Sequence, residues 1–214
     1  MNPKKSTFVP VRLAGVAAHP AYTARFQRDL AQPGLRIPIT DRPKLFAQAA
    51  EVERKVIWLH TFGERFVDRK AGRPKGPPRR PNGPGPRVPK GGSIPDDSAS
   101  MPDEIEYDES RGHLLVGKGF IENVPPAVWQ YEVSGKRVLT QCFSYRRKNR
   151  GRPIIGDRRP PSKLGDIQAQ YWLAEYTTEL LNVLKVLAWL VDLEADQAQI
   201  LEEICDGATL TYRA

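Results

Sequence analysis

The chain has 214 residues, a formal net charge of +8 and an isoelectric point near 9.6. This length allows one domain of ordinary size or two small ones, and the positive charge favours an acidic partner, nucleic acid before membrane. Polar residues interrupt the densest apolar stretch, 180–193, so the sequence predicts no membrane-spanning helix. Because no secretory signal is visible near residue 1, we expect a cytoplasmic protein.

Two helices are predicted in the first part of the chain. Pro20 opens a short helical pattern that Gly34 is placed to end, with apolar residues spaced by four at Tyr22, Phe26 and Leu30. Thr40 or Asp41 can cap a longer helix, whose apolar positions are Leu45, Ala49, Val52, Val56 and Leu59. His60 lies near this face, and we interpret it as a packed or hydrogen-bonded core histidine rather than a ligand.

Glycine and proline dominate the segment 69–100, which also carries many basic residues and no apolar periodicity. This composition predicts a flexible basic insertion. Within it, the run AGRPKG at 71–76 is similar to the core of an AT-hook, which lies extended in the minor groove of DNA. Either minor-groove contact or simple electrostatic attraction would involve Arg73, Lys75, Arg79 and Arg80.

The part 101–214 combines short strands with helices. A hairpin is predicted from 104–107 and 113–116, and the paired prolines 125–126 can start a short helix that ends at Trp129. A strand at 131–133 and a turn at 134–135 lead into a predicted helix over 136–148. The inward positions of that helix are expected to be Val138, Leu139, Cys142 and Tyr145.

The C-terminal third shows the clearest helical pattern. An apolar stripe begins near Asp166 and passes through Trp172, and a second, shorter helix is predicted to end near Gly207. Both cysteines, Cys142 and Cys205, are expected to be reduced core thiols. We therefore predict an α+β fold: a small antiparallel or mixed sheet, helices at both ends and a C-terminal helical hairpin. The parts 1–68, 69–100 and 101–214 together form one predicted domain.

A basic stretch with interleaved aromatic residues is the strongest functional signal. Between Lys136 and Arg159 it carries nine Lys or Arg residues against the single carboxylate Asp157, and Gly, Pro and Ile residues alternate with the arginines. Such a run is often only a solvated face, and cations at 146–148 also complement the dipole of the preceding helix. The aromatic residues and the mixed composition instead favour an ordered surface for a polyanion.

Several motifs resemble one known family. They are FSYRR at 143–147, RPIIGDRRPPS at 152–162, VPPAVW at 124–129 followed by YEVSG at 131–135, and AEYTTELL at 174–181. Together with upstream residues 19–22, 36–39 and 59–60, they are similar to the C-terminal specificity domain of type ISP restriction–modification enzymes. That family joins a nuclease, an ATP-driven translocase and an adenine-specific methyltransferase that uses S-adenosylmethionine to a region that reads the DNA target.

The resemblance implies double-stranded DNA as partner and target recognition as function. The chain lacks a P-loop, an Asn-Pro-Pro-Tyr motif and a glycine-rich cofactor loop, so we expect no enzyme activity, cofactor or metal in it. S-adenosylmethionine and ATP are expected only in catalytic domains or in a methyltransferase/helicase polypeptide. This chain would then be a separate gene product, a truncated member or an assembling piece.

Residue chemistry assigns the expected DNA contacts. Phosphate contacts are expected from Arg146, Arg147, Lys148 and Arg150, and mixed phosphate and base-edge contacts from Arg152, Arg158 and Arg159. Gln141 and Asn149 can pair with adenine, and Lys136 and Arg137 complete the set. Two alternatives stay open: a basic RNA- or protein-binding module, and a stand-alone enzyme, for which the distant residues His19, His60 and His113 offer no catalytic spacing.

Overall fold

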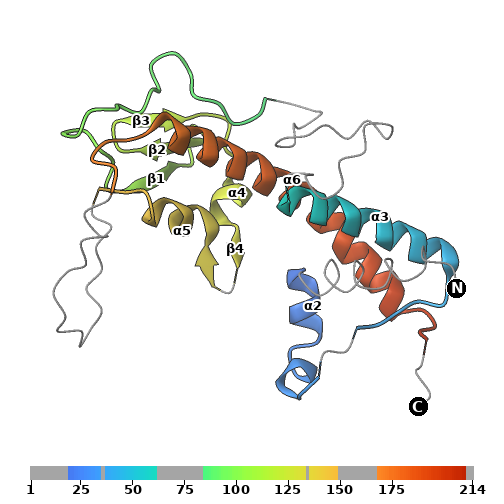
Figure 1. Cartoon of the computed structure of the whole chain (residues 1–214). Coiled ribbons are helices and arrows are strands. Elements are labelled where there is room, and N and C mark those ends of the chain that lie inside the picture. Colours follow the sequence, from blue (N-terminus) through green and yellow to red (C-terminus); the bar gives the residue numbers. More distant parts are fainter. Residues whose placement is uncertain (1–18, 35–36, 62–83, 134, 149–167, 211–214) are drawn as a thin grey trace, which may run out of the picture. The chain divides into compact units, whose positions relative to one another are not determined.

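The structure, a computed structural model, describes residues 19–34, 37–61, 84–133, 135–148 and 168–210 (Figure 1). The chain divides into two compact units. One, which we call the sheet unit, spans 79–188, and the other, the helical unit, combines 1–78 with 189–214. Helices and small antiparallel sheets are both present, so the predicted α+β class is confirmed.

An antiparallel sheet forms the centre of the sheet unit, and its described strands have the order β1-β2-β3. β1 (Ile105–Asp108) and β2 (His113–Val116) form the predicted hairpin, in which Ile105 pairs with Val116, and β3 (Gly119–Ile121) lies on the other side of β2. Leu114, Val116 and Ile121 are fully buried. Alternate residues of these short strands therefore build a core, as the apolar spacing predicts.

Residues that the composition assigns to a flexible insertion are bound to this sheet. Arg87 exchanges backbone hydrogen bonds with Glu122, and the N–H of Phe120 donates to the carbonyl of Gly92 at 2.9 Å. Gly119 permits this close approach, because a Cβ at that position would lie 2.7 Å from the Cα of Ile94. The second half of the segment is therefore not a free linker, whereas 69–83 lies outside the described residues.

After β3 the chain forms α4 (Pro126–Gln130), a small hairpin of β4 (Glu132–Val133) and β5 (Lys136–Arg137), and then α5 (Val138–Ser144). The helix predicted over 136–148 is therefore wrong at both ends. Gly135, with φ of +73°, turns the chain so that its next residues pair with β4 before the helix begins. Tyr145 follows α5 and is 68% exposed, so its predicted inward position is also wrong.

One continuous helix, α6 (Ala174–Cys205), replaces the predicted C-terminal helical hairpin. Neither glycine nor proline occurs within it, and the residues 192–196, which alternate carboxylates with Leu193 and Ala195, are compatible with a helix, so the helix continues there. The residues 168–173 are not helical, so Trp172 precedes α6 instead of belonging to it. Its buried indole packs 5.9 Å from the Phe143 ring and donates a 2.8 Å hydrogen bond to Thr177 Oγ1.

The helical unit contains α2 (Pro20–Arg25), η1 (Asp29–Ala31), α3 (Pro43–His60) and the C-terminal part of α6. Pro20 opens α2 as predicted, and the Nδ1 atom of His19 accepts the N–H of Ala21 at 3.1 Å. The core contains Leu45, Ala49 and Ile204. Of the stripe that the sequence predicts, α3 buries Leu45, Ala49, Val56 and Leu59, and Val52 is half-buried.

Two local predictions for α3 are wrong. Its N-cap is Arg42 rather than Thr40 or Asp41, and no side chain caps it. Thr40 instead pairs with Thr209, and the guanidinium of Arg42 donates to the carbonyl of Glu203 at 2.6 Å. His60 is exposed, not in the core. α3 therefore begins at Pro43, and the residues just before it pair with the chain that follows α6.

Candidate nucleic-acid interface

The structure describes some of the predicted DNA-contacting residues and not others. Those described occupy β5, α5 and the turn that follows, and they are Lys136, Arg137, Gln141, Arg146, Arg147 and Lys148. The following predicted contacts lie outside the described residues: Arg73, Lys75, Arg79, Arg80, Asn149, Arg150, Arg152, Arg158 and Arg159. The interface can therefore be built from the sheet unit up to Lys148.

Arg146 is bound within the protein. Its Nε and Nη2 donate to Glu179 Oε2 of α6 at 2.9 and 2.6 Å, and its Nη1 donates to the Cys142 carbonyl at 2.6 Å. Burial alone would lower the pKa of Arg146, but the hydrogen bond and charge of Glu179 outweigh it, so the pKa is raised. The Arg146 side chain thus ties the end of α5 to α6 as a charged group, with few donors left over.

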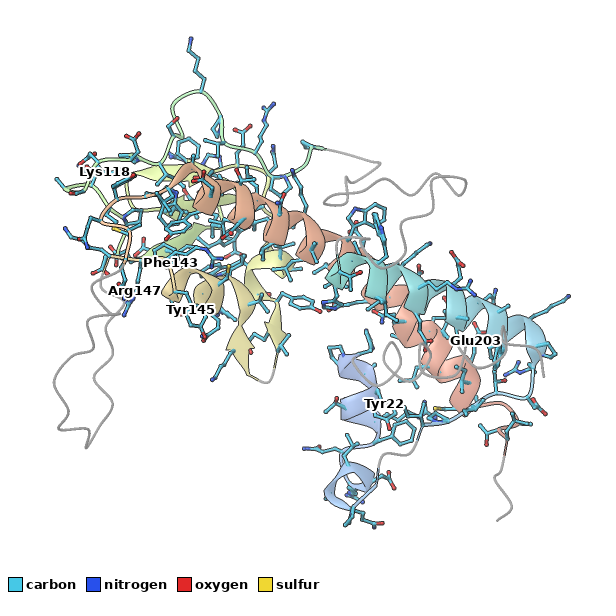
Figure 2. The ribbon with its side chains drawn as sticks, in the orientation of Figure 1. Tyr22, Lys118, Phe143, Tyr145, Arg147 and Glu203 are labelled. Carbon is cyan, nitrogen blue, oxygen red and sulfur yellow. The ribbon has the colours of Figure 1, made fainter. Side chains whose placement is uncertain are left out.

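Backbone bonds hold the chain where it leaves α5. The amides of Arg146 and Arg147 both donate to the Phe143 carbonyl, and the amide of Lys148 donates to the Pro102 carbonyl at 2.8 Å. Phe143 itself is buried beside Trp172. Figure 2 shows Phe143, Tyr145 and Arg147 gathered at this end of α5. The basic stretch therefore starts from an anchored point on a folded unit.

The cations around this point differ in what they contact. Lys148 is exposed, and no carboxylate pairs with its side chain within the ranges described. Arg147 is half-buried, and its Nε is enclosed without a hydrogen-bond partner among the residues described. Lys148 is therefore an exposed cation without an ion-pair partner in this part of the protein, whereas the unpaired Nε of Arg147 is enclosed.

The β4–β5 hairpin carries both types of cation. Arg137 lies 3.7 Å from the Glu132 carboxylate and 5.3 Å above the Trp129 ring, so its charge is already matched. Lys136 is exposed and has no ion-pair partner in the described part of the chain. Of these two, Lys136 is the cation available to a ligand.

Tyr145 is the residue of this surface that the sequence placed wrongly. The exposed Gln141 amide donates from Nε2 to Tyr145 Oη at 2.9 Å. This bond orients the Gln141 amide and leaves its Oε1 as an acceptor. An amide at i and an aromatic residue at i+4 on a helix were the available signal, since such side chains are neighbours.

Other chemistry has little support in the described residues. There, no group of three or more His, Cys, Asp or Glu side chains could hold a metal ion. Burial raises the pKa of the Cys142 thiol, so the thiol is not an activated nucleophile. None of the described helices is both long enough and apolar enough to cross a membrane. What the surface offers is hydrogen-bond donors and positive charge.

The fold and this surface can be compared with known proteins. Among curated proteins, none matches the sequence. The cryo-EM structure of a DrdV–DNA complex is similar with a TM-score of 0.51 and 17% identity, covering 92% of this chain and 18% of DrdV. A nuclease-deletion mutant of the type ISP restriction–modification enzyme LlaGI, in complex with a DNA substrate mimic, has a TM-score of 0.48 and 18% identity, covering 90% of this chain and 13% of that one.

The chain thus spans less than a fifth of the length of either solved protein. The likeness to DrdV concerns the fold. A comparison with protein families extends further, because the family described as the type ISP C-terminal specificity domain matches residues 13–182. That match covers most of both units. It includes the β1–β2 and β4–β5 hairpins and α5, and it ends within the first turns of α6. The chain belongs to the type ISP C-terminal specificity domain family.

Proposed function

We propose that this chain binds double-stranded DNA and reads the target sequence for a type ISP restriction–modification system. The observation that carries the proposal is the anchored end of α5, from which a stretch rich in arginine continues in the sequence from Arg150 to Arg159. Phosphate contacts set the register on a duplex, and a few side chains then read base edges. DrdV was solved as a DNA complex, which supports the same class of ligand here.

Within the described residues, we assign phosphate contacts to Lys136, Arg147 and Lys148. We give Arg146 a structural role, because Glu179 and Cys142 already occupy its donors. Gln141 is the candidate for a base edge, since its amide can offer both a donor and an acceptor to adenine. From the sequence, Arg150, Arg152, Arg158, Arg159 and Asn149 extend this set.

We further propose that the chain makes and breaks no bonds itself. Methylation of adenine and restriction would be carried out by other domains or by a partner polypeptide, which would bind S-adenosylmethionine and ATP. The absence of the corresponding sequence motifs from these 214 residues supports this division.

The test is the salt dependence of duplex binding by the purified chain. Exchange of Arg158 and Arg159 for Ala should weaken binding to a selected duplex and reduce the slope of log affinity against log salt by about two, one unit for each lost phosphate contact. Lys44→Ala with Lys55→Ala is the matched control, because it removes the same charge from exposed positions on α3.

We expect the control to bind nearly as tightly as the natural sequence, with a reduced slope only in the arginine variant. Equal losses in both variants would mean that net charge alone attracts DNA, and unchanged affinity in the arginine variant would contradict the assignment. Competition with RNA and with scrambled duplexes separates target reading from a general basic module.

A further inference from the structure

The β4–β5 hairpin is exposed along both of its strands. Two pairs form it, Glu132 with Arg137 and Val133 with Lys136. Val133 is 57% exposed although it is apolar. Figure 1 shows β4 extending from the sheet unit beyond α5. A single exposed valine is common on protein surfaces, but Val133 lies directly opposite the cation Lys136 in the hairpin, and the two must be considered together.

The base of the hairpin is held firmly. The Val138 amide donates to the Tyr131 carbonyl at 3.1 Å, which closes the hairpin where α5 begins. The Arg137 guanidinium lies over the Trp129 ring, and Trp129 stacks on Tyr107 of β1 with ring centroids 5.8 Å apart. A two-stranded ribbon is only marginally stable alone, so this stack supports its position.

The stack also shows which way each face of the hairpin points. Side chains of successive strand residues lie on opposite faces, and paired residues share a face. Because Glu132 and Arg137 share the face that meets Trp129, Val133 and Lys136 must share the opposite face, away from that ring. The outward face therefore presents one apolar group and one cation about 5 Å apart at Cβ.

Charge makes this face suitable for DNA. The hairpin has one described carboxylate, Glu132, and Arg137 pairs with it at 3.7 Å. Lys136 is therefore left with an unmatched positive charge next to Val133. A two-stranded ribbon fits the major groove, where thymine exposes a methyl group and phosphates line the edge.

We propose that the β4–β5 hairpin enters the major groove, with Val133 against the C5-methyl group of a thymine and Lys136 on a neighbouring phosphate. The inference rests on the proposed function, since it names how the chain reads part of its target. It assigns a base-contacting role to Val133, a residue outside the basic set that the sequence indicates.

The experiment begins by selecting a target from a pool of duplexes with randomised sequence, using the whole 214-residue chain. Each thymine of the selected duplex is then replaced by deoxyuridine, which removes only the methyl group. One position should weaken binding by about fourfold, the effect of burying one methyl-sized group. The same exchange should have no effect on Val133→Ala, whose affinity for the original duplex should already be lower by a similar factor.

Two variants complete the design. Leu210→Ala truncates an apolar side chain of similar exposure, 61%, in the helical unit, and should keep the response to deoxyuridine. Lys136→Ala should weaken binding to all duplexes alike and lower the salt slope by about one.

Failure of this inference can be distinguished from failure of the proposed function. If the natural sequence selects a target but no deoxyuridine exchange weakens it, or if Val133→Ala responds as the natural sequence does, the hairpin inference is overturned. If the natural sequence selects no duplex at all, the proposed function fails and the inference fails with it.

Discussion

A substitution of Arg146 tests whether this cation stabilises the folded protein or contacts DNA. The change Arg146→Ala removes two bonds to Glu179 and one to the Cys142 carbonyl. The Arg146 side chain is 25% exposed and that of Glu179 is 51% exposed, so solvent screens their interaction. Exposed ion pairs contribute about 0.2–1 kcal/mol, and the bond to the less exposed carbonyl adds about 1 kcal/mol. We therefore expect a loss of about 1–2 kcal/mol in the free energy of unfolding.

The measurement is thermal unfolding of four proteins: the natural sequence, Arg146→Ala, Glu179→Ala and the double variant. A chain of this size loses about 2–4 °C in Tm per kcal/mol, so Arg146→Ala should melt about 2–8 °C lower. The two changes should be non-additive by about 0.5–1 kcal/mol, because each removes the same ion pair. Glu179→Ala should lower Tm by less than Arg146→Ala, since the bond to Cys142 survives in it.

A DNA-binding measurement can show whether Arg146 contacts DNA instead of stabilising the fold. If Arg146 is structural, Arg146→Ala leaves the salt slope of duplex binding unchanged at temperatures well below its melting point. An unchanged Tm together with a slope reduced by about one would show that Arg146 contacts a phosphate and that its ion pair yields to DNA. That result would refute the division between bound and available cations.

Two further predictions concern the folded units. Burial lowers the pKa of His19 below its ordinary value of 6.5, so the folded state takes up fewer protons and its stability should fall as pH drops below about 6.5. His19→Asn keeps an N-cap acceptor and should remove that part of the pH dependence of Tm between pH 5 and 8. An unaltered dependence of Tm on pH would exclude His19 as its source. Burial raises the pKa of Glu194, so Glu194 changes stability with the opposite sign, but it does so in both proteins and its contribution cancels in their difference. In urea unfolding, Trp172→Ala should lower the free energy of unfolding by about 3–5 kcal/mol. Trp172→Phe should lower it by about 1–2 kcal/mol, because this change removes the bond to Thr177 but only part of the packing. Equal losses in the two variants would contradict the packing described.

Local signals in the sequence predicted local structure well. Pro20 starts a helix, Gly135 turns the chain, and the alternating residues 104–107 and 113–116 form a hairpin. Each depends on backbone preferences or on neighbours within a few residues. Predictions failed where a residue contacts a partner distant in the sequence. Trp172, for example, was assigned to the C-terminal helix, but it precedes α6 and packs on Phe143.

At the candidate site, too, the sequence did not predict contacts between residues that are distant in the chain. The sequence located the basic stretch, because charge and arginine content are visible without a structure. It could not show that Arg146 meets Glu179, which lies 33 residues away, or that Arg137 meets Glu132 across a turn. It also placed Tyr145 in the core, since an apolar spacing cannot tell where α5 ends.

These ion pairs change how the positive charge of the chain is to be interpreted. Arg137 and Arg146 each pair with a carboxylate of the same chain, and these contacts hold the hairpin and the end of α5 in position. Lys136 and Lys148 lie at the two ends of the same 13-residue stretch and are exposed. Anchored cations thus orient the available ones. Within the described residues, the backbone bonds that hold this exit join Arg146, Arg147 and Lys148 to Phe143 and Pro102, so we expect sequence changes after Lys148 to leave this anchor in place.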